Sequence, residues 1–267
     1  MEKNIYSYFR LTFIFVFLLN LSFVGRAESD SDKNSGSQSQ VKEGVRDFKE
    51  ISYNISFNGV PSGYVVWSYL GKEEVGGREV DVLSVESDAN ILKLLDLVSS
   101  EKIYLDRKTH LPVKVERNVK MFGKKEIIRE KYNQKKGEVT LTRERKDEIV
   151  KEEVYEQDTP IHNILDLLYF FPKGIDLEEK KGKWMNFNLP NQKVQIKFHS
   201  KRKVKVAGKE RKAYFLVGKG AKRFNLWLSL DNRIPLRLDF ISLMGKVIIR
   251  RDEVESPAEN SDKISKK

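Results

Sequence analysis

Alternating apolar and polar residues run through most of the chain between residues 50 and 250. The pattern begins where Tyr53, Ile55 and Phe57 alternate with polar neighbours, and a period of two is typical of a strand with one buried face. Turns rich in glycine, proline or charged residues separate the later segments. The segments predicted as further strands cover residues 64–70, 79–87, 100–106, 111–116, 124–132, 138–145, 148–155, 194–198, 204–206, 213–217, 224–230, 234–240 and 246–250. The pattern predicts a mainly β (α+β) fold.

Two segments depart from this alternation and are predicted as helices. The first is a short capped helix over residues 88–98. The second, over residues 159–172, is the most apolar segment beyond the N-terminus, with Thr159 as its N-cap and Pro160 as its first residue. The apolar residues at helical spacing are Ile161, Ile164, Leu165 and Leu168. Because such a helix needs cover, we expect the strands to curve around it.

The predicted strands fall into two similar groups, one before and one after this helix. The first group contains Tyr104-Leu105-Asp106 and Leu111-Pro112-Val113-Lys114-Val115-Glu116, and the second contains Trp227-Leu228, Asp231 and Ile234-Pro235-Leu236-Arg237-Leu238-Asp239. An aspartate that ends one strand and a proline that opens the next are typical of hairpins, so Asp106 and Asp231 are expected to shape turns. The sequence therefore predicts a single curved antiparallel sheet, or incomplete β-barrel, of two similar meanders wrapped around a central helix.

The N-terminus predicts export from the cytoplasm. A short basic start, an apolar run over residues 11–24 and the small residues of Gly25-Arg26-Ala27 follow the order of a secretory signal peptide. The run is short for a membrane span, which needs about 20 apolar residues. An uncleaved inner-membrane anchor is the alternative, because Asn20 and Arg26 interrupt the pattern. The expected organisation is a signal peptide (1–27), a disordered linker (28–46), a β-rich domain (47–252) and a disordered tail (253–267) of a periplasmic protein.

Charge and cysteine content narrow the classes of partner. The chain has no cysteine, which excludes disulfides and thiolate metal sites. Its formal charge of +11 favours anionic partners, although dispersed lysines also serve solubility alone. Since export argues against nucleic acid, the charged partners left open are an anionic membrane surface, lipopolysaccharide and acidic glycans.

The chemistry-bearing residues do not form a recognisable catalytic pattern. The histidines are His110, His162 and His199. His162 and Asp166 are spaced to share a helix face, but two ligands are too few for a metal site. No metalloprotease, nucleophile-elbow or phosphate-loop motif occurs. We therefore expect a non-enzymatic protein with no catalytic residues, no metal and no cofactor.

Some strands carry more apolar residues than one buried face requires. The segment 64–70 is apolar on both faces, as expected of a strand that is covered on both sides or faces a ligand cavity on one. The candidate residues of an apolar cavity are Trp67, Tyr69, Leu165, Leu168 and Trp227. Ordinary core packing is the alternative for all of them.

Several of these features, in this order, carry a resemblance to a known family. They are Gly59-Val60-Pro61-Ser62-Gly63, Trp227-Leu228 with Asp231, Ile234-Pro235-Leu236-Arg237, and a helix that ends in Leu168-Tyr169-Phe170. Together they resemble the exported bacterial domain-of-unknown-function family 3108. The order of strand, aspartate, proline and strand is also similar to the lipoprotein carriers and receptors of outer-membrane sorting, which fold as curved, incomplete barrels around helices with a hydrophobic cavity.

These patterns lead to one expected function and two alternatives. We expect an envelope protein whose half-open barrel binds a lipid, an acyl chain or another apolar ligand. The first alternative is an assembly or protein-interaction module with a filled core, which would use the charged segment 124–155 to contact another envelope protein. The second is an enzyme acting on envelope polymers.

Overall fold

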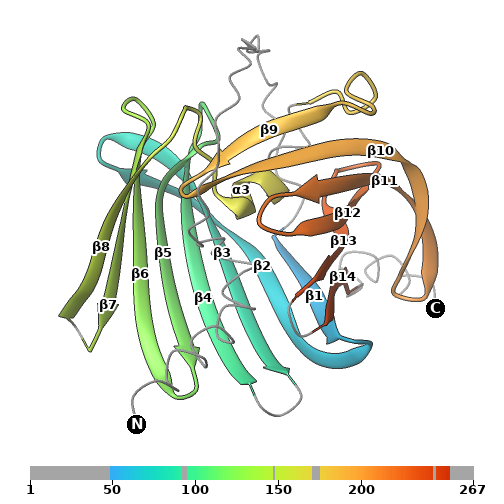
Figure 1. The fold of residues 1–267 in the computed structure, drawn as a ribbon, viewed down its shortest axis with the longest axis horizontal. Coiled ribbons are helices and arrows are strands. Elements are labelled where there is room, and N and C mark those ends of the chain that lie inside the picture. Colours follow the sequence, from blue (N-terminus) through green and yellow to red (C-terminus); the bar gives the residue numbers. More distant parts are fainter. Residues whose placement is uncertain (1–48, 92–94, 147, 170–174, 243–244, 253–267) are drawn as a thin grey trace, which may run out of the picture.

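The computed structural model describes residues 49–91, 95–146, 148–169, 175–242 and 245–252. Within these ranges the chain forms a 14-stranded antiparallel sheet and one short helix, α3, over Ile164–Tyr169 (Figure 1). The first strands are β1 (Glu50–Phe57), β2 (Val60–Val75), β3 (Arg78–Ile91), β4 (Leu95–Asp106), β5 (Pro112–Met121), β6 (Lys124–Asn133), β7 (Glu138–Arg145) and β8 (Glu148–Glu156). After α3 follow β9 (Trp184–Leu189), β10 (Gln192–Val206), β11 (Lys209–Lys219), β12 (Arg223–Ser229), β13 (Pro235–Ile241) and β14 (Lys246–Arg251).

The predicted terminal segments cannot be placed on this sheet. The signal peptide (1–27), the linker (28–46) and the tail (253–267) lie outside the described residues. In the part of the chain that the structure describes, no helix has the length and apolar character needed to cross a bilayer.

The order of the strands makes each half of the chain an antiparallel meander. The sheet runs β8-β7-β6-β5-β4-β3-β2-β1-β14-β13-β12-β11-β10-β9, so the first and last strands pair in its middle. The strands that flank α3 in sequence, β8 and β9, are its outer strands, and the sheet curves without closing (Figure 1). The prediction of a mainly β fold with a single curved antiparallel sheet is confirmed.

The segment between β8 and α3 joins the two ends of the curve. Ile161 forms an isolated parallel bridge with Asn188 of β9, and the His162 N–H donates to the Asn188 carbonyl at 2.7 Å. Gln134, just after β6, donates to the Ile161 carbonyl at 2.7 Å and accepts from the Ile161 N–H at 3.0 Å. The segment therefore covers the outer edge of β9 and ties it to the first meander.

The helix inside this curve is shorter than the sequence predicted. α3 has six residues, whereas the apolar spacing predicted a helix over residues 159–172. Asn163 is its N-cap, since its Oδ1 accepts from the Leu165 N–H at 2.9 Å. Asp166 Oδ2 accepts in turn from the Asn163 N–H at 2.7 Å, which completes a capping box.

The expected N-cap at Thr159 and the expected first helical residue at Pro160 are therefore wrong. The backbone groups of Ile161 and His162 are already bonded to Gln134 and to β9, so they are not free to form a helical turn. The predicted end of the helix, at residues 170–172, lies outside the described residues.

The helix predicted over residues 88–98 is also wrong, because this stretch continues the sheet. β3 extends to Ile91, β4 begins at Leu95, and the two strands pair along their length. Ala89 and Leu97 are buried while their neighbours in sequence are exposed, which is the period of a strand. The acidic and amide residues that looked like helix caps lie on the solvent face.

One hydrophobic core fills the concave side of the sheet. It draws residues from both meanders, and Leu165 and Leu168 of α3 belong to it. Two smaller clusters lie on the convex face, one containing Tyr104 and the other packed against Trp227. The curvature of the sheet thus places α3 against the inner faces of strands from both halves.

The turns of the two similar hairpins are held by side chains. Asp106 Oδ1 accepts from two backbone N–H groups of its turn, each at 2.9 Å, as predicted. In the second hairpin, Asn232 Oδ1 accepts from the Ile234 N–H at 3.2 Å and Ser229 Oγ accepts from the Asp231 N–H at 3.3 Å. Asp231 therefore contributes its backbone N–H to the turn.

Candidate functional site

A cavity lies on the concave side of the sheet, between α3 and the strands near the β1–β14 junction. Its volume is about 50 Å³ and its lining is mainly apolar. The lining includes Trp67 of β2, Val85 of β3, Leu226 of β12, Ile249 of β14, and Leu165 and Leu168 of α3.

The structure brings together part of the residue set predicted for an apolar cavity. The predicted residues that line the cavity are Trp67, Leu165 and Leu168. Tyr69 lies two residues beyond Trp67, and its hydroxyl donates to Asp81 Oδ1 at 3.0 Å. Trp227 is on the opposite face of the sheet, where its ring centroid lies 4.9 Å from that of Phe215.

The sequence missed Tyr53, Leu226 and Ile249 as lining residues. Alternation identifies which residues of one strand share a face, but it does not say which strands stand opposite α3. The pairing of β1 with β14 decides this point, and it joins segments nearly 200 residues apart in the chain. For Leu226 the sequence did offer a signal. It is one of the two apolar residues that flank Trp227, and alternation places these flanking residues on the face opposite Trp227.

The inner face of β4, β5 and β6 carries a buried ion network, and we call this face the charged wall. Glu101, Arg117 and Glu130 lie on it, one from each strand, and all are buried. Arg117 donates to Glu101 through Nε at 2.6 Å and through Nη2 at 2.9 Å, which is a bidentate pair. Arg117 Nη1 lies 3.7 Å from Glu130 Oε1. One guanidinium thus faces two carboxylates.

Burial shifts the pKa values of this network. It raises the pKa of Glu101 above the usual value, and the positive charge of Arg117 opposes that rise only in part. Burial alone would lower the pKa of Arg117, but the charges of Glu101 and Glu130 outweigh it and raise that pKa further. The guanidinium therefore stays charged, and the two carboxylates supply the compensation that a buried cation requires.

The charged wall extends to the N-terminus of α3. The Tyr132 hydroxyl donates to Glu130 Oε2, and Asn163 Nδ2 lies 3.5 Å from both that carboxylate oxygen and the Tyr132 hydroxyl. Asp166 joins the N-cap Asn163 to His162, whose Nδ1 is 2.9 Å from Asp166 Oδ1. Burial raises the pKa of Asp166, and His162 opposes that rise. A chain of polar contacts thus fixes the helix start on this wall.

The second half of the chain carries a matching hairpin without these charges. Leu105 stands opposite Pro112 in the first hairpin, and Leu228 stands opposite Pro235 in the second. Counted from these pairs, Glu101, Arg117 and Glu130 correspond to Phe224, Phe240 and Ile249. At these three positions the inner face of the first hairpin is therefore ionic, whereas that of the second is apolar.

We call the inner face of β12, β13 and β14 the apolar wall. Phe224 stands opposite Phe240 where the charged wall has its ion pair. Gly218 of β11 makes room for the Phe224 ring, since a Cβ at that position would lie 2.0 Å from its Cζ. Ile249 lines the cavity. The apolar wall, the inner faces of β1, β2 and β3, and α3 thus enclose the cavity, while the charged wall holds the helix.

The polar groups of the site make contacts that stabilise the local structure. His162 and Asp166 form a pair, but His162 precedes the N-cap, so the two do not share a helix face as their spacing predicted. In the ranges that the structure describes, no group of three or more histidine, aspartate and glutamate side chains is placed to hold a metal ion. His199 is exposed and its Nδ1 lies 3.3 Å from Ser200 Oγ. The feature of this face that offers binding is the apolar cavity.

Comparison with known proteins gives a family and a fold. The sequence model of a family described as "Protein of unknown function (DUF3108)" matches residues 52–250. No curated protein matches the chain. A crystal structure of a beta-barrel-like protein of the domain of unknown function DUF1849 from Brucella abortus is similar, with a TM-score of 0.50 and 10% sequence identity over 76% of this chain and 95% of that one. At this identity the likeness shows the fold alone.

Proposed function

The chain belongs to the DUF3108 family, and from the geometry of its concave face we propose that it is a non-enzymatic envelope protein that binds an apolar group between α3 and the apolar wall. The observation that carries this proposal is the cavity lined by Trp67, Leu226 and Ile249. Leu165 and Leu168 of α3 close it from the other side. A well-packed core leaves few voids larger than a water molecule, so a cavity of this kind needs an explanation.

The size of the cavity limits the ligand. Its volume of about 50 Å³ exceeds the roughly 10–15 Å³ that one water-sized probe occupies. It is far below the roughly 300–1,000 Å³ of pockets that enclose a drug-sized molecule. The geometry therefore favours the end of an acyl chain, a few methylenes long, over a whole lipid. The rest of such a ligand would lie outside the cavity.

The proposed compartment is the periplasm, supported by the signal peptide predicted over residues 1–27. An anchor left uncleaved would keep the same domain at the inner membrane. The net charge of +11 supports contact with an anionic membrane surface in either case. Cell fractionation, with the N-terminal residue of the mature protein determined, distinguishes export with cleavage from anchoring. Recovery of the protein from the cytoplasm would contradict both.

The binding proposal is tested on protein purified gently from cells that express the full chain. Mass spectrometry of extracts should find an acyl compound, and the neutral apolar dye N-phenyl-1-naphthylamine should bind with enhanced fluorescence. Val85→Phe fills the cavity and should weaken dye binding at least tenfold. Val113→Phe adds the same volume on the convex face and should leave it unchanged. Thermal unfolding of both variants checks that the fold is retained.

The proposal would be wrong if the wild-type protein binds neither lipid nor dye. It would also be wrong if Val85→Phe binds the dye as well as the wild type, because the dye would then occupy another place.

A second function is favoured by the outer strand β8. Ile149, Val150 and Val154 are 62%, 51% and 59% exposed on a strand that pairs on one side only among the described residues. Unpaired edges with exposed apolar residues are sites where another chain adds a strand. The chain would then be an assembly module, with this edge within the charged segment that the sequence suggested.

A photo-crosslinker at Val154 should capture one defined envelope protein, and Val150→Lys should abolish the crosslink. A crosslink that persists would reject this function.

A further inference from the structure

A buried hydroxyl at the cavity has no hydrogen-bond partner among the described residues. Tyr53 lines the cavity and is 2% exposed, and its hydroxyl oxygen is buried without a partner. Its ring centroid lies 5.2 Å from that of Trp67, which fixes the ring in place. A buried hydroxyl without a partner loses the hydrogen bonds that it makes to water in the unfolded chain. Such a group needs an explanation, and a ligand is one.

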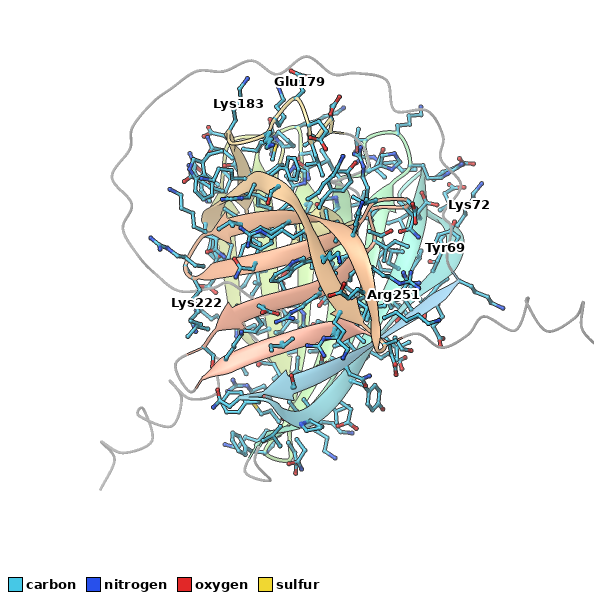
Figure 2. All side chains as sticks on the ribbon, turned by 90° about the vertical axis from the view of Figure 1, so that its right-hand side faces the viewer. Tyr69, Lys72, Glu179, Lys183, Lys222 and Arg251 are labelled. Carbon is cyan, nitrogen blue, oxygen red and sulfur yellow. The ribbon has the colours of Figure 1, made fainter. Side chains whose placement is uncertain are left out.

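An arginine pairs with Tyr53 across the strands β1 and β14. Arg251 is directly opposite Tyr53 in the β1–β14 pairing and two residues beyond Ile249, so it points to the same concave face. Figure 2 labels it at the end of the last strand. Its Nε is buried without a hydrogen bond, and no carboxylate of the described residues forms an ion pair with it. Burial raises the pKa of Tyr53, and the charge of Arg251 opposes that rise, which agrees with their closeness.

Comparison of the two walls shows that Arg251 lacks the carboxylate partners that Arg117 has. On the charged wall, Arg117 is compensated by Glu101 and Glu130. On the apolar wall, the position that matches Glu130 is Ile249, which has no charge to offer to Arg251. The apolar wall therefore has a cation at its edge but no anion of its own within the described part of the chain. A ligand with an acidic group would supply the missing charge.

We propose that Tyr53 and Arg251 bind the acidic head, carboxylate or phosphate, of an acyl ligand whose chain end enters the cavity. This inference rests on the proposed function and specifies its ligand class. The guanidinium offers a fork of N–H donors to the oxyanion, and the Tyr53 hydroxyl donates a further hydrogen bond. The head lies at the cavity edge, so the chain has only to extend along Trp67 toward α3.

The test compares three ligands that have the same chain length and differ in the head group. Dodecanoate, dodecyl phosphate and the neutral dodecanol compete with N-phenyl-1-naphthylamine for the purified full-chain protein. We expect at least one of the two anions to bind tenfold or more tightly than dodecanol, and the tighter anion identifies the head as a free carboxylate or a phosphate. Arg251→Gln should remove this preference and leave dodecanol binding unchanged. Arg250→Gln is the matched control, because Arg250 is the neighbouring residue of β14 on the opposite face.

Tyr53→Phe provides a second variant that removes only the hydroxyl. It should weaken binding of the preferred anion about threefold to tenfold without lowering the thermal stability of the free protein. A purely structural hydroxyl would show the reverse, a loss of stability with unchanged affinity. Arg251→Lys keeps the charge without the fork and should retain part of the preference.

Several results would overturn the inference. Equal binding of all three ligands to the wild type would leave the proposed function standing and reject the acidic head. If Arg250→Gln and Arg251→Gln lose the preference for anions equally, the preference comes from general surface charge and not from a site at Arg251. An equal loss of anions and dodecanol in Arg251→Gln would mean that the residue supports the fold. Failure of every ligand and of the dye on the wild type would reject the proposed function as well.

Discussion

The charged wall and the apolar wall share one hairpin plan but place opposite chemistry on the inner face of the sheet. The matching inner positions are Glu101 and Phe224, Arg117 and Phe240, and Glu130 and Ile249. The outer faces agree instead, since Tyr104 packs in one small apolar cluster and Trp227 packs against another. Shared turns and outer clusters are therefore enough to specify the hairpin. The residue types at the inner positions can therefore differ between the two hairpins, according to what packs against each wall.

The difference gives each wall its own relation to α3. The charged wall reaches the helix start through Tyr132 and Asn163, and hydrogen bonds have preferred directions, so the helix has one position on it. The apolar wall faces Leu165 and Leu168 across the cavity, and apolar contact is not directional. The wall that holds the helix is thus polar, and the wall that leaves space for a ligand is apolar.

The largest expected effect comes from the same substitution at matching positions of the two walls. Arg117→Leu leaves Glu101 and Glu130 buried without their cation and should lower the free energy of unfolding by about 3–5 kcal/mol. Phe240→Leu keeps an apolar residue in the core and should lower it by about 1–1.5 kcal/mol. Urea unfolding followed by circular dichroism measures both. Equal losses would mean that the two walls do not differ in how they contribute to stability.

The next effect is a rescue on the charged wall. The double variant Glu101→Leu with Arg117→Leu removes both partners of the bidentate pair, so it no longer leaves Glu101 unpaired. We expect it to be more stable than Arg117→Leu alone by about 1–3 kcal/mol, and the double-mutant cycle in urea gives this coupling directly. Additive losses would show that the pair contributes nothing beyond its separate residues.

The sequence predicts what repeats locally and misses what depends on distant pairing. Alternation located most of the strands but missed β9, and turn chemistry at Asp106 was predicted correctly because its partners are two or three residues away. The helix over residues 159–172 was predicted too long, since nothing local shows that Asn188 and Gln134 bond the backbone at Ile161 and its neighbour. Such competition between helix and sheet is decided by tertiary contacts.

The site was predictable only in part, for the same reason. Trp67 was found because its strand is apolar on both faces. Tyr53 and Arg251 were missed because each is an ordinary strand residue until β1 pairs with β14. Glu101 and Arg117 were not singled out in the sequence, because only cross-strand pairing brings them together and buries them. Charge patterns along one strand do not reveal a partner on the next.

A smaller effect tests the charged wall by pH, because Glu101 on this wall and Asp166 of the helix that it holds are buried carboxyl groups with raised pKa values. For Glu101 and Asp166 the folded pKa lies above the ordinary values of 4.5 and 3.8. Their contribution to stability is therefore fully present below those ordinary values and is lost as pH rises through the raised ones. The free energy of unfolding of the wild type relative to Asp166→Asn should fall over this range. Urea unfolding at a series of pH values measures it, and a difference that grows with pH would mean that the Asp166 pKa is lowered.

Removal of one buried tyrosine hydroxyl should have opposite signs on the two sides of the comparison. Tyr132→Phe removes a hydroxyl that donates to Glu130 and should lower the free energy of unfolding by about 1.5–3 kcal/mol. Tyr53→Phe removes a buried hydroxyl that has no hydrogen-bond partner among the described residues, and should raise it by about 1 kcal/mol in protein freed of ligand. Thermal and urea unfolding of delipidated protein compare the two variants. A loss in both would mean that Tyr53 already has a partner within the chain, and the apolar wall would then lack the unpaired hydroxyl that an acidic ligand needs.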